Sequence, residues 1–218
     1  MGETSANRSD PVVGVLLAGG QARRMGGGDK CMLELAGKPL LEHVIERLEP
    51  QTDTLVLNAN DDPARFAAFG RPVVADPVDG FAGPLAGVLA GFVWARENVP
   101  QARWIVTAAT DTPFFPLDLV SCFMSATDGS YPAIALAASR GRIHPVFGLW
   151  PTALADDLHQ AVMGGTRKVL DWTDRHTTVT AEFSDTHIGG SDLDPFFNAN
   201  RPEDLAHAEA LLAEDVPT

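Results

Sequence analysis

The chain has 218 residues, of which 45% are hydrophobic, so it is long enough for one domain with a substantial core. Its 29 acidic and 16 basic residues give a net charge of −13, which argues against nucleic-acid binding, because that function needs a basic face. A small anionic substrate is attracted only if the site gathers cations or a metal. The apolar run 81–95 is too short and too rich in glycine to span a membrane. With only two cysteines and a polar segment over 1–10, we expect no disulfide framework, no signal peptide and a cytoplasmic protein.

A glycine-rich, basic stretch follows the first apolar run. Residues 12–17 read VVGVLL, which is typical of a central strand covered on both faces. The loop after it contains five glycines and three of the 16 basic residues, namely Gly19, Gly20, Gly26, Gly27, Gly28, Arg23, Arg24 and Lys30. Glycine lets the backbone approach a ligand, and backbone amides and cations bind phosphate. The stretch matches neither common phosphate-loop pattern. From the residues alone it is either a polyphosphate-binding loop or a surface turn with incidental arginines.

Strands and helices alternate along the rest of the chain, after a lead over 1–11 that we expect to be disordered. Strands are predicted over 12–17, 54–57, 72–75, 104–108, 133–138, 142–150 and 177–182. Helices are predicted over 39–48, 63–69, 84–96, 116–125, 152–162, 169–172 and 202–212. This alternation predicts an α/β fold, Rossmann-like, with three layers (α/β/α) and a mostly parallel sheet. The strand over 142–150 is expected to be antiparallel.

Four predicted strands end in glycine or polar residues, at Gly19-Gly20, Asn58, Asp76 and Asp111. In open α/β sheets, ligands bind beyond the carboxyl ends of the strands, so we expect these residues to face one crevice. A carboxylate at Asp111 could hold Mg²⁺, although it could also cap the helix that follows. Asn58 and Asp76 could contact a ligand or only form turns. Lys30 could face phosphates or be solvated, as most lysines are.

The loop resembles a known family. Its segments Leu17-Ala18-Gly19-Gly20, Arg24-Met25-Gly26-Gly27 and Asp29-Lys30 are similar to the signature of the molybdenum cofactor guanylyltransferases. More widely, they resemble the L-A-G-G type of nucleotidyltransferase. The resemblance continues at Asp111-Thr112-Pro113-Phe114, Gly83-Pro84-Leu85-Ala86-Gly87, His144-Pro145 and Asn198-Ala199-Asn200. The chain departs from the family's usual pattern at Ala109-Thr110, where Pro-Cys is common, and at Arg201, where Thr is common.

The resemblance assigns roles to individual residues. It implies that Lys30, Arg24 and Asp111 are catalytic, with Asp111 also the metal ligand. The nucleotide would be bound by Leu17, Ala18, Gly19, Gly20, Lys30, Asn58, Asp76 and Asp111. The second substrate would meet His144, Arg167, Asn198 and Asn200. For His144 the residues alone leave open a hydrogen-bonded strand histidine, for Arg167 a solvated turn, and for the asparagines an N-cap of the last helix.

The function that the resemblance implies is transfer of GMP from Mg-GTP to the terminal phosphate of molybdopterin, with release of pyrophosphate. Residues 12–214 would form one domain, with a nucleotide-binding half over 12–115 and a pterin half over 116–214. The alternatives are a cytidylyl- or sugar-phosphate nucleotidyltransferase with the same loop, and a nucleotide-binding regulator without turnover. The resemblance also implies transient contacts with cofactor-synthesis proteins or molybdoenzymes. We expect GTP rather than CTP, because guanylyl members have glycine at the position of Gly19 and cytidylyl members have alanine.

Overall fold

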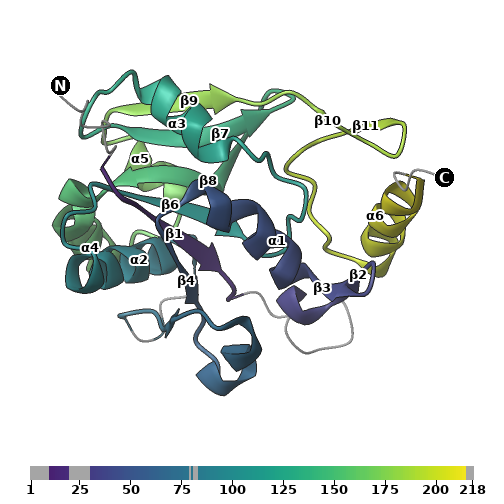
Figure 1. The fold of residues 1–218 in the computed structure, drawn as a ribbon. Helices are drawn as coiled ribbons and strands as arrows, with labels where there is room; N and C mark the ends of the chain where they lie inside the picture. The colour runs from purple at the N-terminus through teal and green to yellow at the C-terminus, as the bar shows by residue number, and fades with distance from the viewer. Residues whose placement is uncertain (1–9, 20–29, 79, 81–82, 215–218) are drawn as a thin grey trace, which may run out of the picture.

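The computed structural model describes residues 10–19, 30–78, 80 and 83–214. Its centre is a seven-stranded sheet in the order β5-β4-β1-β6-β8-β7-β9 (Figure 1). Strand β1 (Val12–Leu17) lies between β4 (Thr54–Asn58) and β6 (Trp104–Ala109) and is parallel to both. Strand β5 (Val73–Val74) extends this parallel part beside β4. The carboxyl ends of these strands therefore lie at one edge of the sheet.

The other part of the sheet contains the antiparallel strand. Strand β8 (Arg142–Pro151) is antiparallel to β6 and to β7 (Ile134–Ser139). Strand β9 (Thr178–Glu182) pairs in parallel with β7 and forms the edge. The prediction of a mostly parallel sheet with an antiparallel strand over 142–150 is confirmed.

Helices cover both faces of the sheet, because both faces of β1 are apolar. Val12 and Leu16 lie in one core cluster, and Val13 and Val15 lie in another, since successive side chains of a strand point to opposite faces. The first cluster includes residues of α1 (Leu40–Leu48) and α3 (Leu119–Thr127). The second includes residues of α2 (Pro84–Asn98), α4 (Ala155–Met163) and α5 (Val169–Thr173). The three-layer arrangement that the sequence predicts is confirmed.

A third, smaller cluster, at the right of Figure 1, joins residues 35–40 to the C-terminal part of the chain. It contains Leu35 and Leu40 together with Leu193 and Leu211. The elements that meet here are the β2–β3 hairpin (Glu34–Leu35, Lys38–Pro39), the β10–β11 hairpin (Thr186–Ile188, Ser191–Leu193) and α6 (Pro202–Glu214). Because this cluster anchors α6 beside the first residues after the phosphate loop, segment 194–201 is brought back toward β1 and β6.

Several predicted elements differ in detail. The predicted strand over 72–75 is reduced to β5, and the helix expected from 116 begins at Leu119. Both two-stranded hairpins are absent from the prediction, because strands of two or three residues carry no readable periodicity. The remaining elements are four 3₁₀ helices, η2 (Lys30–Met32), η3 (Glu49–Gln51), η4 (Pro63–Phe69) and η5 (Thr152–Leu154). None of the helices described is long and apolar enough to cross a membrane.

Candidate functional site

Three distant segments meet at Lys30. The side chain of Lys30 is buried, with the residue only 9% exposed, so it is not a solvated lysine. Its Nζ donates to Asp111 Oδ2 at 2.5 Å and also to Asn200 Oδ1. Lys30 opens η2, Asp111 follows β6, and Asn200 precedes α6. The contact therefore joins the phosphate-loop end, the carboxyl edge of the sheet and the last segment of the chain.

The segment 198–200 is held against Asp111 by two further contacts. The amide of Ala199 donates to the Asp111 carbonyl at 2.8 Å. The buried hydroxyl of Thr112 lies 2.7 Å from Asn198 Oδ1 and 3.2 Å from Asp111 Oδ1, so its single proton goes to the nearer amide oxygen. Neither asparagine caps α6 with its side-chain oxygen, because that of Asn198 accepts from Thr112 and that of Asn200 accepts from Lys30. Asp204 accepts from the amides of Asn200 and Arg201 instead.

The carboxylate of Asp111 suits a divalent metal ion that takes most of its other ligands from the phosphates of a bound substrate. A quarter of the Asp111 side chain is exposed, and its Oδ1 is not engaged by Lys30. Among the residues that the structure describes, no group of three or more His, Cys, Asp or Glu side chains could hold a metal by itself. Mg²⁺ commonly binds one or two carboxylates together with substrate phosphates. Asp111 is therefore a suitable anchor for a metal-phosphate complex.

Asn58 and Asp76 lie together beyond β4 and β5. The Asn58 side chain, which is 5% exposed, donates to Asp76 Oδ1 at 3.0 Å. Asn60 completes this turn by donating to Asp76 Oδ2 and accepting from the Asp76 amide. Helix α2 packs directly on this region, because a Cβ on Gly87 would lie 2.5 Å from Asn58 Oδ1 and 2.6 Å from Leu17. Gly87, the last residue of the segment Gly83-Pro84-Leu85-Ala86-Gly87, thus allows the helix to pack closely on the sheet.

A pocket opens beside Asp111 on the side of β8. It has a volume of about 300 Å³ and is lined by Asp111, His144, Phe196, Asn198 and Asn200, among others. A second hollow of about 400 Å³ shares four of these residues, namely His144, Phe196, Asn198 and Asn200. The structure thus brings together Lys30, Asp111 and three of the four residues predicted to meet the second substrate.

His144 is both a hydrogen-bonded strand histidine and a pocket residue. Its ring stacks on Phe196 with centroids 4.5 Å apart, and its Nε2 lies 2.8 Å from Ser139 Oγ. Burial lowers the pKa of His144, and Arg142 lowers it further, whereas Asp194 acts to raise it. The ring is therefore neutral at pH 7.

Arg167 lies elsewhere among the described residues. Its carbonyl oxygen is 3.5 Å from the place that a Cβ on Gly83 would take, so its loop faces the start of α2. It does not line the pocket that contains His144 and Asn198. Gly20 and Arg24 lie outside the described residues. Leu17 is the last residue of β1, and Ala18 and Gly19 follow it directly. The Ala18 amide donates to the Asn58 carbonyl at 2.9 Å.

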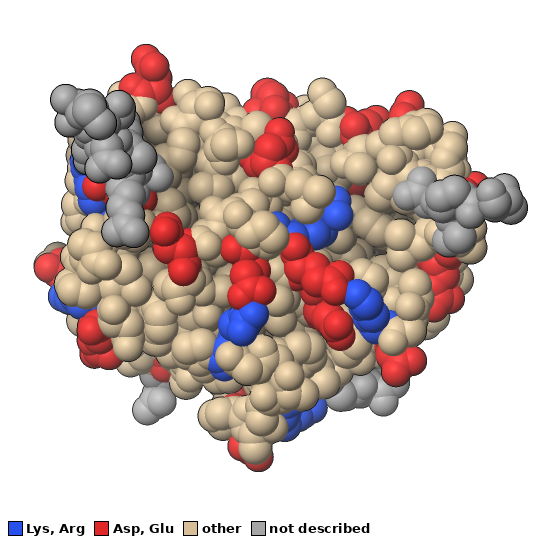
Figure 2. Space-filling model, in the orientation of Figure 1, with Lys and Arg blue, Asp and Glu red and all other residues tan. Residues whose placement is uncertain are grey.

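The protein as a whole is acidic, with a net charge of −13. Figure 2 shows acidic side chains spread over the visible face, with basic ones between them. An anionic ligand of this acidic protein therefore depends on local cations such as Lys30. A separate cavity of about 770 Å³ lies at the opposite end of β1 and β6, where Asp53, Trp104 and Leu117 line it. It contains none of the predicted site residues.

Sequence reasoning did not find Thr112, Ser139, Asp194 or Phe196 as parts of this region. Thr112 could have been suspected, because it adjoins Asp111 after a strand. Ser139 gives no local signal, since a serine before an Arg-Gly turn is ordinary. Asp194 and Phe196 reach the pocket only because the third cluster folds their segment back.

Comparisons with known proteins agree on one family. A family model described as a MobA-like NTP transferase domain matches residues 14–179. The chain is 53% identical to a molybdenum cofactor guanylyltransferase of Rhodopseudomonas palustris (strain BisB5) over 92% of this chain and 94% of that protein. It is 51% identical to a protein of the same name from Bradyrhizobium sp. (strain ORS 278), over 96% and 97% of the two chains.

A solved structure resembles the fold. Molybdopterin-guanine dinucleotide biosynthesis protein A from Archaeoglobus fulgidus matches with a TM-score of 0.71 at 23% identity. The match covers 93% of this chain and 99% of that one. At this identity the likeness supports the fold alone.

Proposed function

The chain belongs to the molybdenum cofactor guanylyltransferases, and we propose that it transfers GMP from Mg-GTP to the terminal phosphate of molybdopterin. The observation that carries this proposal is the junction of Lys30, Asp111 and Asn200 beside a pocket. The junction unites a cation and a carboxylate from the first half of the chain with an amide from the second half. A reaction that joins two substrates needs such a meeting point.

The first half would bind the nucleotide. The backbone of Leu17, Ala18, Gly19 and Gly20, with Lys30 and Arg24, would surround the triphosphate, and Asn58 and Asp76 would contact the nucleotide beyond β4 and β5. Lys30 is well suited to this role, because a buried ammonium has lost much of its hydration and is held at one place by Asp111. Its charge acts strongly where water is excluded.

Asp111 would hold Mg²⁺ through Oδ1, the carboxylate oxygen that Lys30 does not engage. Bound there, the ion would supply charge neutralisation for the triphosphate and the pyrophosphate that leaves. Lys30 would balance the carboxylate when nucleotide is absent and turn part of its charge to the phosphates when nucleotide binds. The Ala199 amide, which donates to the Asp111 carbonyl, and the hydrogen bond from Thr112 to Asn198 would hold the backbone at Asp111 in place.

The chemistry needs no covalent intermediate. An oxygen of the molybdopterin phosphate attacks the α-phosphorus of GTP in line, a new P–O bond forms, and the bond to the pyrophosphate oxygen breaks. The site contributes by positioning the two phosphates and by neutralising their charge. His144, Asn198 and Asn200 would hold the second substrate, and Arg167 would contribute from the α2 side. We place the reaction in the cytoplasm, with transient contacts to cofactor-synthesis proteins or molybdoenzymes.

The test is a pyrophosphate-release assay with GTP, Mg²⁺ and molybdopterin. We expect turnover that requires all three and that stops on chelation of the metal. Parallel reactions replace GTP by CTP, and molybdopterin by a sugar phosphate. Efficient turnover with either substitute would favour the cytidylyl- or sugar-phosphate alternative. Nucleotide binding without any turnover would identify a regulator instead of an enzyme.

A further inference from the structure

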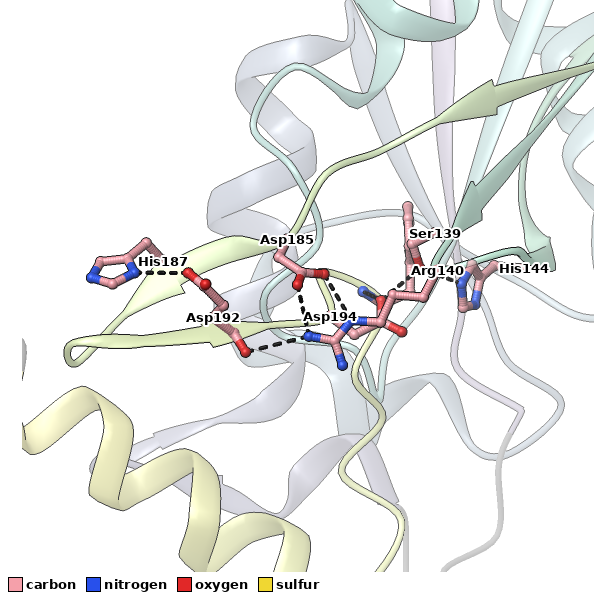
Figure 3. Close-up of polar contacts among 8 residues, drawn as sticks. Ser139, Arg140, His144, Asp185, His187, Asp192 and Asp194 are labelled. Carbon is pink, nitrogen blue, oxygen red and sulfur yellow. Dashed lines mark hydrogen bonds and ion pairs between the residues drawn. The ribbon is translucent and has the colours of Figure 1, made fainter.

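A buried serine lies behind the pocket histidine. Figure 3 shows Ser139 between Asp194 and His144. Ser139 ends β7 and is completely buried. Its Oγ is 2.8 Å from His144 Nε2 and 2.7 Å from Asp194 Oδ1. The three side chains come from β7, β8 and the returning segment, so only the folded protein assembles them.

The hydrogen-bond directions in this group follow from counting protons. Asp194 Oδ1 also accepts from the Phe196 amide at 3.0 Å, as an ionised carboxylate does. The serine hydroxyl has one proton, which it donates to Asp194 at 2.7 Å. Its oxygen can then only accept from His144, so the histidine proton is on Nε2 and the lone pair is on Nδ1.

This order differs from a hydrolase triad, where the histidine stands between the serine and the acid. Here the serine stands in the middle, is inaccessible and gives its proton to the carboxylate. It cannot act as a nucleophile. What the group can do is fix the orientation and tautomer of the imidazole, as partners of the second ring nitrogen do in other sites.

His144 lines the pocket, and its second ring nitrogen is not used by the buried group. Of the residues that the structure describes, Ser139 hydrogen-bonds Nε2 and none hydrogen-bonds Nδ1. The ring lines the same pocket as Asp111, Asn198 and Asn200, and its face is fixed by Phe196. The charged groups near it are Asp194 and Arg142. Burial keeps the ring neutral, so the Nδ1 lone pair is present at pH 7.

We propose that Ser139 and Asp194 are positioning residues that hold His144 as the Nε2–H tautomer, so that its Nδ1 accepts a hydrogen bond from an N–H group of the second substrate. This rests on the proposed function, whose second substrate is a nitrogen heterocycle that carries a phosphate. A role as general base is less suitable. A phosphate monoester has its second pKa at about 6, so the attacking group is already ionised at pH 7.

The test compares variants of Asp194 with a control on the same surface. Asp194→Ala removes the acceptor and frees the serine proton to point at His144, which should mix the two tautomers. Asp194→Asn keeps an oxygen that can accept from Ser139 and from the Phe196 amide, and should restore the wild-type behaviour. The control is Asp185→Asn, because Asp185 pairs with Arg140 nearby and lies outside the hydrogen-bonded group of Ser139, His144 and Asp194.

Two measurements separate positioning from general damage. Calorimetry and steady-state kinetics give the molybdopterin affinity and the KM for each substrate. Nuclear magnetic resonance of ¹⁵N-labelled histidine, with His144 assigned from the His144→Gln spectrum, gives the tautomer. We expect Asp194→Ala to weaken molybdopterin binding about fivefold, the size of one lost neutral hydrogen bond, with the KM for GTP unchanged. Asp194→Asn and Asp185→Asn should remain within twofold of wild type.

Each result decides the proposal. A wild-type His144 protonated on Nδ1 would overturn it, as would an Asp194→Ala variant with altered tautomers and normal molybdopterin affinity. Equal losses for GTP and molybdopterin in folded Asp194→Ala would show general damage and also overturn it.

The failure of the proposed function can be told apart from the failure of the positioning proposal. A wild-type protein that binds molybdopterin but releases no pyrophosphate refutes the proposed function, and the binding comparison still decides the positioning proposal. A protein that does not bind molybdopterin refutes both. Ser139→Ala should repeat the Asp194→Ala result if it remains folded.

Discussion

The two halves of the chain place their functional side chains by different means. Before residue 116, the polar residues lie at the carboxyl ends of parallel strands, since Asn58 is the last residue of β4 and Asp111 comes shortly after β6. After residue 116, His144 lies on an antiparallel strand, and Asn198 and Asn200 lie on a segment outside the sheet. The first arrangement follows from strand topology. The second depends on a separate apolar cluster that fixes where the segment returns.

At the candidate site, the two halves meet at the side chain of Lys30. Lys30 belongs to the first half, and it bonds Asp111 from the same half and Asn200 from the other. A change at this contact should affect use of both substrates. A change away from it should affect only one. The predictions below test this difference, beginning with the largest expected effect.

Replacement of Asp111 by Asn should stop metal-dependent turnover while the fold is kept. A neutral amide is a poor Mg²⁺ ligand but can still accept from Lys30. We expect kcat/KM to fall about 100- to 1000-fold, the scale on which a bound metal stabilises transferred charge. Pyrophosphate release at limiting Mg²⁺ measures it. The control is Asp118→Asn, in the cavity at the opposite end of the sheet, which should change nothing. Near-normal turnover in Asp111→Asn would refute the metal role.

Replacement of Lys30 by Ala should weaken catalysis more than folding. Loss of a charge-stabilising donor in an excluded site costs about 3 kcal/mol of barrier, or about 100-fold in kcat/KM. The matched control is Lys38→Ala, because Lys38 pairs with Glu46 at the exposed surface. Thermal melting with steady-state kinetics separates the two effects. An unfolded Lys30 variant, or one with unchanged kcat/KM, would count against the role.

The two asparagines of segment 198–200 should behave differently. Asn198 contacts Thr112 and the pocket, so Asn198→Ala should raise the KM for molybdopterin up to about tenfold and leave GTP binding intact. Asn200 bonds Lys30, so Asn200→Ala should weaken binding of both substrates. Calorimetric titration with Mg-GTP gives the decisive value. If Asn198→Ala lost GTP affinity as strongly as Asn200→Ala, the two halves would not be separable in this way.

Much of the first half could be predicted from residue patterns. The apolar run over 12–17 is buried on both faces, and the polar residues after the parallel strands lie at one edge as strand topology requires. The pairing of Lys30 with Asp111 was beyond prediction, because their 81-residue separation leaves no local signal. The roles of both residues in binding remain predictions.

The second half of the chain was less predictable from the sequence for a physical reason. Strands β10 and β11 have three residues each, and the segment over 194–201 has no periodic pattern. Their positions come from contacts of Leu193 with the cluster around Leu35 and Leu211, which are long-range packing contacts. The sequence therefore predicted that Asn198 lies in the site only through family resemblance, and it gave no indication of Ser139 or Asp194.

The smallest expected effect is a change in the preference for GTP over CTP when Gly19 is replaced. A Cβ there would meet no atom of the residues that the structure describes within 4 Å, so we expect Gly19→Ala to alter stability by no more than about 0.5 kcal/mol. Gly91→Ala is the contrasting variant. Its Cβ would fall 2.6 Å from Cγ2 of the buried core residue Val15, so we expect about 1–3 kcal/mol of destabilisation without a change in base preference.

Any loss of activity caused by Gly19→Ala is therefore expected to come from contact of the new methyl group with the bound nucleotide. A methyl group beside the end of β1 takes room that a purine needs and a pyrimidine does not. One such group costs about 1 kcal/mol, so the preference for GTP over CTP should narrow roughly fivefold, mainly through weaker use of GTP. Competition of the two nucleotides in one turnover assay measures the ratio for the wild type and both variants. Equal use of CTP by the unmodified protein would contradict the guanylyl assignment, and a lower melting temperature in Gly19→Ala would show that the space beside β1 is not open.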